Sequence, residues 1–531
     1  MRVSLLSAAV GVAVFGNVQA AEDIGLKFEH QLQAKSVKLF GFVQPLKSSA
    51  DAGDVVPRNL AAASERQLLA KGLKAEYVTR AVGGNGDMIT FWPDDIHYTH
   101  LIVCNELGRD GVTPGGNDGY TPAVQRVDVK TGEVETILHG MDRCDGLRTT
   151  QWGTVLVTEE AGDDGSAYEI IEPLSTTGHW IADRGAAGMP ADIRDGVDSA
   201  QVSDKVVKRT ALVAQSWEGL DVLDNGVVIG GDELRPSLDT DGGAIFRFVP
   251  SELYNCQGAP VRPGRLCDNT ISDLADSPLA AGTNYALATV CNGTDDFGQG
   301  CESGNGLWVA ITDPGNARAE AAEAGATGYC RPEDLHVDGS YGEFVGGEGI
   351  RWCWNNTCAG GGGEALCVTE TDLDAQTASF NADFGRNLLD ASATVTRFVE
   401  NDAEMRNHDN LDIQPHTSNV YVIEDYNEID SGGTGGDVWA CLPDGGDRDT
   451  KTDGCVRVLS ITDPEAEPSG FIFDGTGKVA YYHVQHGEQY DELRDFESNP
   501  VDGRTDDLIR ITGFKLPKGS YKGARYNKYR D

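Results

Sequence analysis

The sequence predicts an all-β protein: a single-domain β-propeller of six or seven blades, with Cys-rich loop insertions and a short N-terminal helix. From about Lys74 onward, short runs rich in Val, Ile, Tyr and Phe alternate with Gly, Asp, Asn and Pro, which is typical of strands separated by turns. One strand unit also recurs along the chain, and a fixed repeat indicates a repeat architecture. A propeller requires such a repeat, whereas a pair of jelly rolls, the structural alternative, does not.

The repeated unit begins with an acidic residue, passes through a turn into a short apolar strand, and ends in two more carboxylates. Its copies span 145–160, 218–233 and 409–425, and the third copy carries one extra residue. The innermost strands of a propeller line its central channel. We therefore expect Asp145, Glu218 and Asp409 to lie near one rim, with the trailing acids either one strand-length away or serving the next turn.

Carboxylates crowded into such a channel repel one another unless cations bind there or the pKa values are raised. A cluster of oxygen ligands without an obvious set of histidines suits hard ions, above all Ca²⁺. Any one of these acids is better explained as a turn cap. Three in register favour a metal site.

The organisation of the chain follows from composition and periodicity. Residues 1–20 have the basic start, apolar run and small-residue end of a signal peptide cleaved near Ala20. Residues 21–73 form an extension whose helix begins near Ser64, and the propeller covers 74–515, with insertions at about 251–306 and 430–455. A second short helix is expected at 317–324. An acidic run at 444–449 favours a plain loop over a calcium loop, and 516–531 form a tail.

The formal charge of −41, from 84 acidic against 43 basic residues, argues against a nucleic-acid partner, which requires clustered Lys and Arg. After the signal peptide, no segment approaches the ~20 apolar residues of a membrane span. The signal lacks an Arg-Arg pair, which favours general secretion. We therefore expect a periplasmic or secreted protein, with a monomer as the default state.

Twelve cysteines in an exported chain predict disulfides. Three close pairs are expected, and Cys104 and Cys144 remain as a fourth. The close pairs are Cys256/Cys267, Cys291/Cys301 and Cys441/Cys455. The pairing within the group Cys330, Cys353, Cys358 and Cys367 cannot be read from the sequence, and the spacing matches no standard zinc finger.

Several short motifs, in order, resemble the PhoX alkaline phosphatases, a family of exported, calcium-dependent, iron-containing propellers. The stretch 151–160, Gln-Trp-Gly-Thr-Val-Leu-Val-Thr-Glu-Glu, is similar to the family's Pro-Trp-Gly-Thr-Trp-Leu-Thr-Cys-Glu-Glu. Trp217-Glu218-Gly219-Leu220 and Arg331-Pro332-Glu333-Asp334 resemble its two Arg-Pro-Glu-Asp repeats. Further matches lie at 85–93 with 103–106, at 409–411, and at 484–487, where Val-Gln-His-Gly resembles Gln-His-Pro-Gly.

The resemblance implies hydrolysis of phosphate monoesters in the propeller channel, with a small phosphorylated substrate. Arg331 would bind the substrate phosphate and Glu333 would take part in catalysis. The implied metal ligands are Glu106, Glu159, Glu160, Glu218, Glu333 and Asp409. Asp145, Thr158 and His486 are expected beside them or at altered positions.

The departures from the family pattern concern iron. Thr158 stands where the family has the cysteine that bridges its two irons, and a hydroxyl bridges ferric ions far less well than a thiolate. The carboxylates that match the family's metal ligands are present, so the sequence favours Ca²⁺ over Fe³⁺. Two other functions stay open: a non-catalytic, metal-stabilised propeller that binds a ligand or partner, and a lactonase-like hydrolase on the same scaffold.

Overall fold

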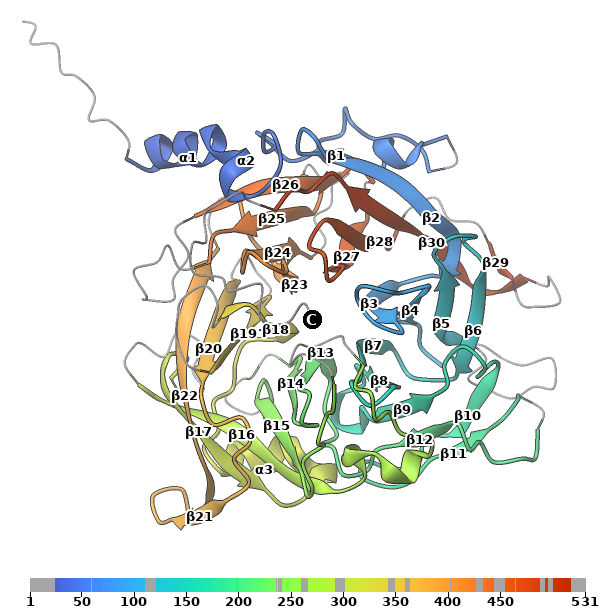
Figure 1. Ribbon diagram of the computed structural model, residues 1–531, viewed down its shortest axis with the longest axis vertical. Coiled ribbons are helices and arrows are strands. Elements are labelled where there is room, and N and C mark those ends of the chain that lie inside the picture. The colour runs from blue at the N-terminus through green and yellow to red at the C-terminus, as the bar shows by residue number, and fades with distance from the viewer. Residues whose placement is uncertain are drawn as a thin grey trace, which may run out of the picture.

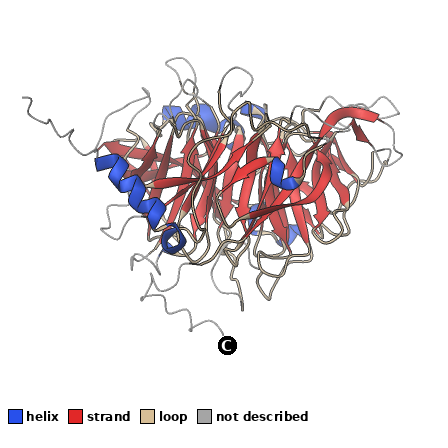
Figure 2. Ribbon diagram, turned by 90° about the horizontal axis from the view of Figure 1, so that it is seen from above, coloured by secondary structure: helices blue, strands red, loops and turns tan. Residues whose placement is uncertain are grey.

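The computed structural model describes residues 24–516, apart from 59, 110–120, 198, 235, 237–240, 259–265, 292–300, 342–348, 359–362, 402–403, 426–432, 444–453, 464, 488–491 and 495–499. The described chain is a disc of strands arranged around a central axis (Figures 1 and 2). The acidic run at 444–449 falls outside the described residues.

Six strands form the inner ring, each touching the next, and the sixth touching the first, so the ring closes with six blades in the described chain. Figure 1 looks down this ring, and each strand leads outward into its own blade. The inner strands are β3 (Gly86–Trp92), β7 (Cys144–Thr149), β13 (Trp217–Val222), β18 (Pro332–Asp338), β23 (His408–Ile413) and β27 (Glu467–Phe473). The predicted all-β propeller is confirmed.

The remaining strands extend each blade outward. Neighbours are antiparallel except at β10, which joins β6 in parallel. Blade 1 adds β4 (His100–Asn105), β5 (Pro122–Asp128), β6 (Val134–His139), β10 (His179–Asp183) and β11 (Asp192–Arg194), and blade 2 adds β8 (Thr154–Glu159), β9 (Ala167–Ile171) and β12 (Val206–Lys208). Blade 3 adds β14 (Val228–Asp232), β15 (Ile245–Pro250), β16 (Gly282–Cys291) and β17 (Gly304–Ile311), and blade 4 adds β19 (Ile350–Asn356), β20 (Glu364–Glu370), β21 (Ala378–Asn381) and β22 (Arg386–Glu400). Blade 5 adds β24 (Val420–Glu424), β25 (Asp437–Cys441), β26 (Cys455–Ile461) and β1 (Gln67–Leu69), and blade 6 adds β28 (Val479–Gln485), β29 (Glu492–Arg494), β30 (Pro500–Thr512) and β2 (Lys74–Gly83).

Both predicted insertions contribute strands to the blades. Residues 251–306 hold β16, which pairs with β15 along its length, and β17 then pairs with β22 to join blades 3 and 4 into one ten-stranded sheet. Residues 430–455 hold β25, which pairs with β24. Both insertions are rich in turn-forming residues, which conceal these strands in the sequence.

The N-terminal segment differs from its prediction. Three α-helices are described: α1 (Ile24–Ala34) and α2 (Ser36–Leu39) in a region expected to be extended, and α3 (Ala317–Glu323) where a helix was predicted. The helix predicted from Ser64 is wrong, since only a 3₁₀ turn forms at Ala63–Glu65 before β1. Hydrogen bonding to β26 at the edge of blade 5 overrides the local helical signal there.

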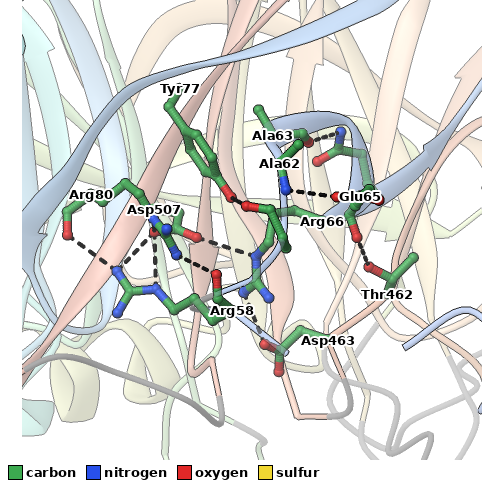
Figure 3. A network of polar contacts seen from close by, with 12 residues as sticks. Arg58, Ala62, Ala63, Glu65, Arg66, Tyr77, Arg80, Thr462, Asp463 and Asp507 are labelled. Atoms are coloured by element: carbon green, nitrogen blue, oxygen red, sulfur yellow. Dashed lines mark hydrogen bonds and ion pairs between the residues drawn. The ribbon is translucent and has the colours of Figure 1, made fainter. Parts of the chain in front are cut away.

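The two ends of the propeller meet in blade 6, where β2 pairs with β30. Beside this pairing, three arginines surround the buried carboxylate of Asp507 (Figure 3). Nη2 of Arg58 lies 2.8 Å and Nε of Arg80 lies 3.0 Å from Oδ1 of Asp507. Nε of Arg66 lies 3.2 Å from Oδ2, and Nη2 of Arg66 donates to Asp463 at 2.9 Å. These ion pairs thus connect the N-terminal extension to β30, the last strand of the chain.

The core consists of apolar layers between facing blades rather than one central cluster. Ile102 and Val124 of blade 1, for example, pack with Leu147 and Val157 of blade 2, and all four side chains are fully buried. Among the described residues, no helix is both long and apolar enough to cross a membrane.

Five disulfides are present in the described chain: Cys104–Cys144, Cys256–Cys267, Cys330–Cys358, Cys353–Cys367 and Cys441–Cys455. They confirm three of the predicted pairs and resolve the group of four. The side chain of Cys291, and with it the predicted pair Cys291/Cys301, lies outside the described residues. Five disulfides are typical of an oxidising compartment.

Candidate metal site at the channel mouth

The inner strands bring five acids to equivalent places in five blades. In each of these blades the second residue of the inner strand is acidic: Asp87, Asp145, Glu218, Glu333 and Asp409. A register shift follows between the first and fourth residues of these five strands, for example between Trp217 and Leu220 and between His408 and Leu411. In β27 it lies two residues further along, between Ser469 and Ile472. Such a bulge bends the strand and turns side chains away from the regular alternation.

The second strand of each blade returns the chain to the same end of the channel. In five blades, the residue that follows this strand donates its backbone N–H to the carbonyl of the residue that precedes the inner strand. These contacts are Glu106 to Asn85 (2.7 Å), Glu160 to Arg143 (2.9 Å), Glu233 to Ser216 (2.9 Å), Thr357 to Arg331 (3.2 Å) and Asp425 to Asn407 (2.8 Å). The leading and trailing acids of the repeated unit therefore share one rim, which decides between the two placements left open by the sequence.

Three overlapping triads of carboxylates form at this rim, which we call the channel mouth. They are Asp87, Asp145 and Glu218; Glu160, Glu218 and Glu233; and Glu218, Glu333 and Asp409. Within each triad, one oxygen of every residue lies within 4.8 Å of the others. Glu218 belongs to all three, so the triads are parts of one cluster.

Burial and mutual repulsion raise the pKa values of these acids. Burial first, and then the charges of neighbouring carboxylates, raise the pKa of Asp87 to about 7, of Glu160 to about 7 and of Glu233 to about 8. The same causes place the pKa values of Asp145 and Glu218 well above their usual range. Protons or cations must therefore compensate this cluster.

The donor set fits a hard divalent cation. Every triad member offers carboxylate oxygens, and Oδ1 of Asp145 is buried without a hydrogen-bond partner. Oxygen ligands of this kind, at flexible spacing, suit Ca²⁺. Thr158 does not replace a bridging thiolate, because its buried hydroxyl donates to the carbonyl of Gly146 at 3.0 Å. The described residues thus fit calcium better than a thiolate-bridged iron pair.

Arg331 and His486 stand at the edge of the cluster. Arg331 donates from Nε to Glu233 at 2.6 Å, and the same Nε lies 3.5 Å from Glu333. Nε2 of His486 lies 3.3 Å from Oε1 of Glu467 in blade 6. Both side chains are about one-third exposed, 32% for Arg331 and 37% for His486, so they can reach a molecule in the channel mouth.

Most of the predicted site residues meet here. Glu160, Glu218, Glu333, Asp409 and Asp145 belong to the triads, and Glu106 lies beside them, accepting a hydrogen bond from Gln485 at 3.1 Å. Glu159 does not join them. Its carboxylate is held by Arg184 at 2.8–3.1 Å, away from the triads.

Asp87 and Glu233 belong to the cluster but were absent from the predicted ligand set. Glu233 ends one copy of the repeated unit and directly follows Asp232. The repeat therefore marks both acids but does not show which of them faces the channel. Asp87 lies in a matched motif at 85–93 whose strand carries no trailing pair of acids.

The fold and the site together define a six-bladed propeller whose channel mouth is lined by carboxylates. No family model matches the chain, and no curated protein matches its sequence. Among solved structures, the chain resembles PhoX from Pseudomonas fluorescens in complex with vanadate, a transition-state analogue. That match has a TM-score of 0.52 and 15% identity, and it covers 90% of this chain and 99% of that one.

Two other solved structures match less closely. A gluconolactonase structure has a TM-score of 0.32 at 11% identity, covering 88% of this chain and 97% of that one. The holo PQQ domain of pyranose dehydrogenase from Coprinopsis cinerea has a TM-score of 0.28 at 10% identity, covering 84% and 97%. At such identities, the likeness to PhoX shows the fold alone.

Proposed function

We propose that the protein is an exported, Ca²⁺-dependent hydrolase of phosphate monoesters. One observation carries this proposal: a guanidinium group, that of Arg331, lies beside three overlapping carboxylate triads in the channel mouth. Bound cations and a neighbouring arginine can bind a phosphoryl group together, because the positive charge of each compensates the negative charge of the phosphoryl oxygens. The PhoX fold, which binds vanadate in the structure that the chain resembles, supports the same reading.

Each residue has a defined role in this proposal, and Glu233 and Glu333 have two. The seven triad carboxylates hold the metal ions, and bound calcium supplies Lewis acidity towards the phosphoryl oxygens. Arg331 orients the phosphate through its planar fork of N–H donors. Glu233 and Glu333 fix the position of that guanidinium from two blades.

Turnover of an aryl phosphate by the mature protein tests the proposal. Hydrolysis should require Ca²⁺, cease after chelation and return when Ca²⁺ is added back, with metal content measured in parallel. Bound calcium without turnover would contradict the phosphatase function and leave a metal-stabilised binding propeller. Turnover of a lactone but not of the phosphate would favour the lactonase-like alternative, and stoichiometric iron would contradict the inference from Thr158.

A matched pair of variants tests the ligand assignment. Glu333→Ala should weaken calcium binding by roughly tenfold or more, because it removes one carboxylate from the cluster. Glu172→Ala is the control, since Glu172 is exposed and pairs with Lys205 at 3.1 Å on the outside of blade 2. Calorimetric titration with Ca²⁺ measures both, and equal effects would remove the channel-mouth carboxylates from the metal site.

A further inference from the structure

Two arginines occupy the same structural position in different blades. Arg143 directly precedes β7 and Arg331 directly precedes β18. The carbonyl of each accepts the backbone N–H of the residue that follows the next strand, Glu160 in one blade and Thr357 in the other. Both arginines have a left-handed backbone, with φ of 53° and 54°.

Each of these arginines is also anchored by a disulfide. Cys144 follows Arg143 and is bonded to Cys104, whereas Cys330 precedes Arg331 and is bonded to Cys358. A left-handed backbone costs free energy for a residue with a side chain, so it persists only where its surroundings fix it. The two covalent links supply that constraint next to each guanidinium.

The two guanidinium groups flank one pair of carboxylates. Nη1 of Arg143 lies 3.7 Å from Glu160, and Arg331 donates to Glu233 at 2.6 Å. Glu160 and Glu233 are themselves neighbours within one triad. The blade between the two arginines has Ser216 at the equivalent position, so that position carries no third guanidinium group.

We propose that Arg143 and Arg331 form a two-arginine clamp for a dianionic oxyanion such as a terminal phosphate. Arg143 was not among the predicted site residues. Its side chain is 44% exposed and its only ion pair among the described residues is the long one to Glu160, which leaves most of its five N–H donors available. A monoester dianion offers oxygens to both guanidinium groups, whereas a diester carries one charge and two blocked oxygens.

This clamp rests on the proposed phosphomonoester chemistry, but its test is binding rather than turnover. The variants are Arg143→Asn and Arg331→Asn, because Asn85 and Asn407 occupy the equivalent positions of blades 1 and 5 with φ of 55° and 50°. The substitution therefore keeps the backbone and removes only the guanidinium. Arg194→Ala is the control, since Arg194 pairs with Asp192 on the outer strand β11.

Calorimetric titration of the calcium-loaded protein with inorganic phosphate should show a roughly 10- to 100-fold weaker affinity for each Asn variant, as expected for a lost charge-assisted hydrogen bond. Calcium affinity should not fall in either variant, because each removes a cation and leaves every triad carboxylate in place. The control should not change, and dimethyl phosphate should bind wild type more weakly than phosphate does. Unchanged phosphate affinity in Arg143→Asn would overturn the clamp while leaving hydrolysis through Arg331 intact. An equal loss of calcium binding would also overturn it, by making Arg143 a support for Glu160.

Wild type that hydrolyses an aryl phosphate but binds free phosphate no better than dimethyl phosphate would overturn the clamp alone. Wild type that binds phosphate with Arg143-dependent affinity but hydrolyses nothing would overturn the proposed function alone.

Discussion

Two groups of buried charges in this propeller are balanced in opposite ways. Around Asp507, three guanidinium groups surround one carboxylate at the seam between β2 and β30 (Figure 3). At the channel mouth, seven carboxylates form one cluster, with two arginines at its edge. The carboxylate of the first group has its counter-charges within the protein, whereas the carboxylates of the second require a cation or bound protons.

The difference separates stability from function. A buried ion pair adds little net stability, but removing one partner leaves an uncompensated charge. The stability that depends on the seam should therefore change on mutation of these residues and should not change on metal binding. At the channel mouth, repulsion between carboxylates lowers the stability of the metal-free fold. Such repulsion is expected at a functional site, where a bound ligand supplies the compensating positive charge.

Removal of the central carboxylate at the seam should have the largest effect. Asp507→Asn leaves three arginines without their shared partner and should lower the free energy of unfolding by about 3–5 kcal/mol. Denaturant unfolding measures this loss. Glu76→Ala is the control, because Glu76 is exposed and pairs with Arg510 at the surface of the same blade, and it should change stability little. Similar effects of the two variants would contradict the account of the seam.

Calcium binding should have the next largest effect on the free energy of unfolding, and the size of this effect should depend on pH. At about 100 times its Kd, calcium should add about 2.7 kcal/mol to the free energy of unfolding. Carboxylates with raised pKa values stabilise the metal-free fold while protonated, so its stability should fall as pH rises from about 4 through the values of about 7 and 8 for Asp87, Glu160 and Glu233. Calcium affinity should rise over the same range. Thermal unfolding with calcium and with chelator at several pH values tests both trends, and stability independent of calcium would contradict the cluster.

The smallest effect should have the opposite sign. Glu218→Gln puts a neutral amide in place of the carboxyl group shared by all three triads. The chelated protein no longer has to bury that carboxylate or protonate it on folding, so it should become more stable at pH 8, on the order of 1 kcal/mol. The same variant should lose calcium binding. Destabilisation of the chelated protein would indicate that Glu218 holds the fold rather than a metal. Comparison of this variant with Asp507→Asn distinguishes buried carboxylates that have counter-charges within the protein from those that require a ligand.

The fold and part of the site follow from local sequence. The repeated acid–strand–acid unit places Asp145, Glu218 and Asp409 at one rim, because identical units occupy identical places in a propeller. The hairpin geometry then brings the trailing acids back to the same rim, although spacing alone did not show this. The short apolar runs at 155–157 and 420–423 lie in β8 and β24, as expected for apolar runs bounded by turn-forming residues.

Other features depend on contacts that the local sequence does not contain. In each pair of trailing acids, the two side chains point to opposite sides of the chain. The pattern Glu159-Glu160 therefore does not reveal that Arg184 holds Glu159 while Glu160 faces the channel. The continuity of blades 3 and 4 through β17 and β22 is equally hidden, since these strands are separated by four other strands, β18 to β21, in the sequence.

The pairing of β2 with β30 has a consequence for the order of folding. The strand that opens the propeller waits for residues 500–512 before it has a partner, so the ring is completed by one of the longest-range contacts in the chain. Chains dominated by such contacts fold slowly, because loop closure must precede the stabilising interactions. Until that seam forms, the facing surfaces of the first and last blades stay exposed, which makes the unclosed ring the species most prone to aggregate.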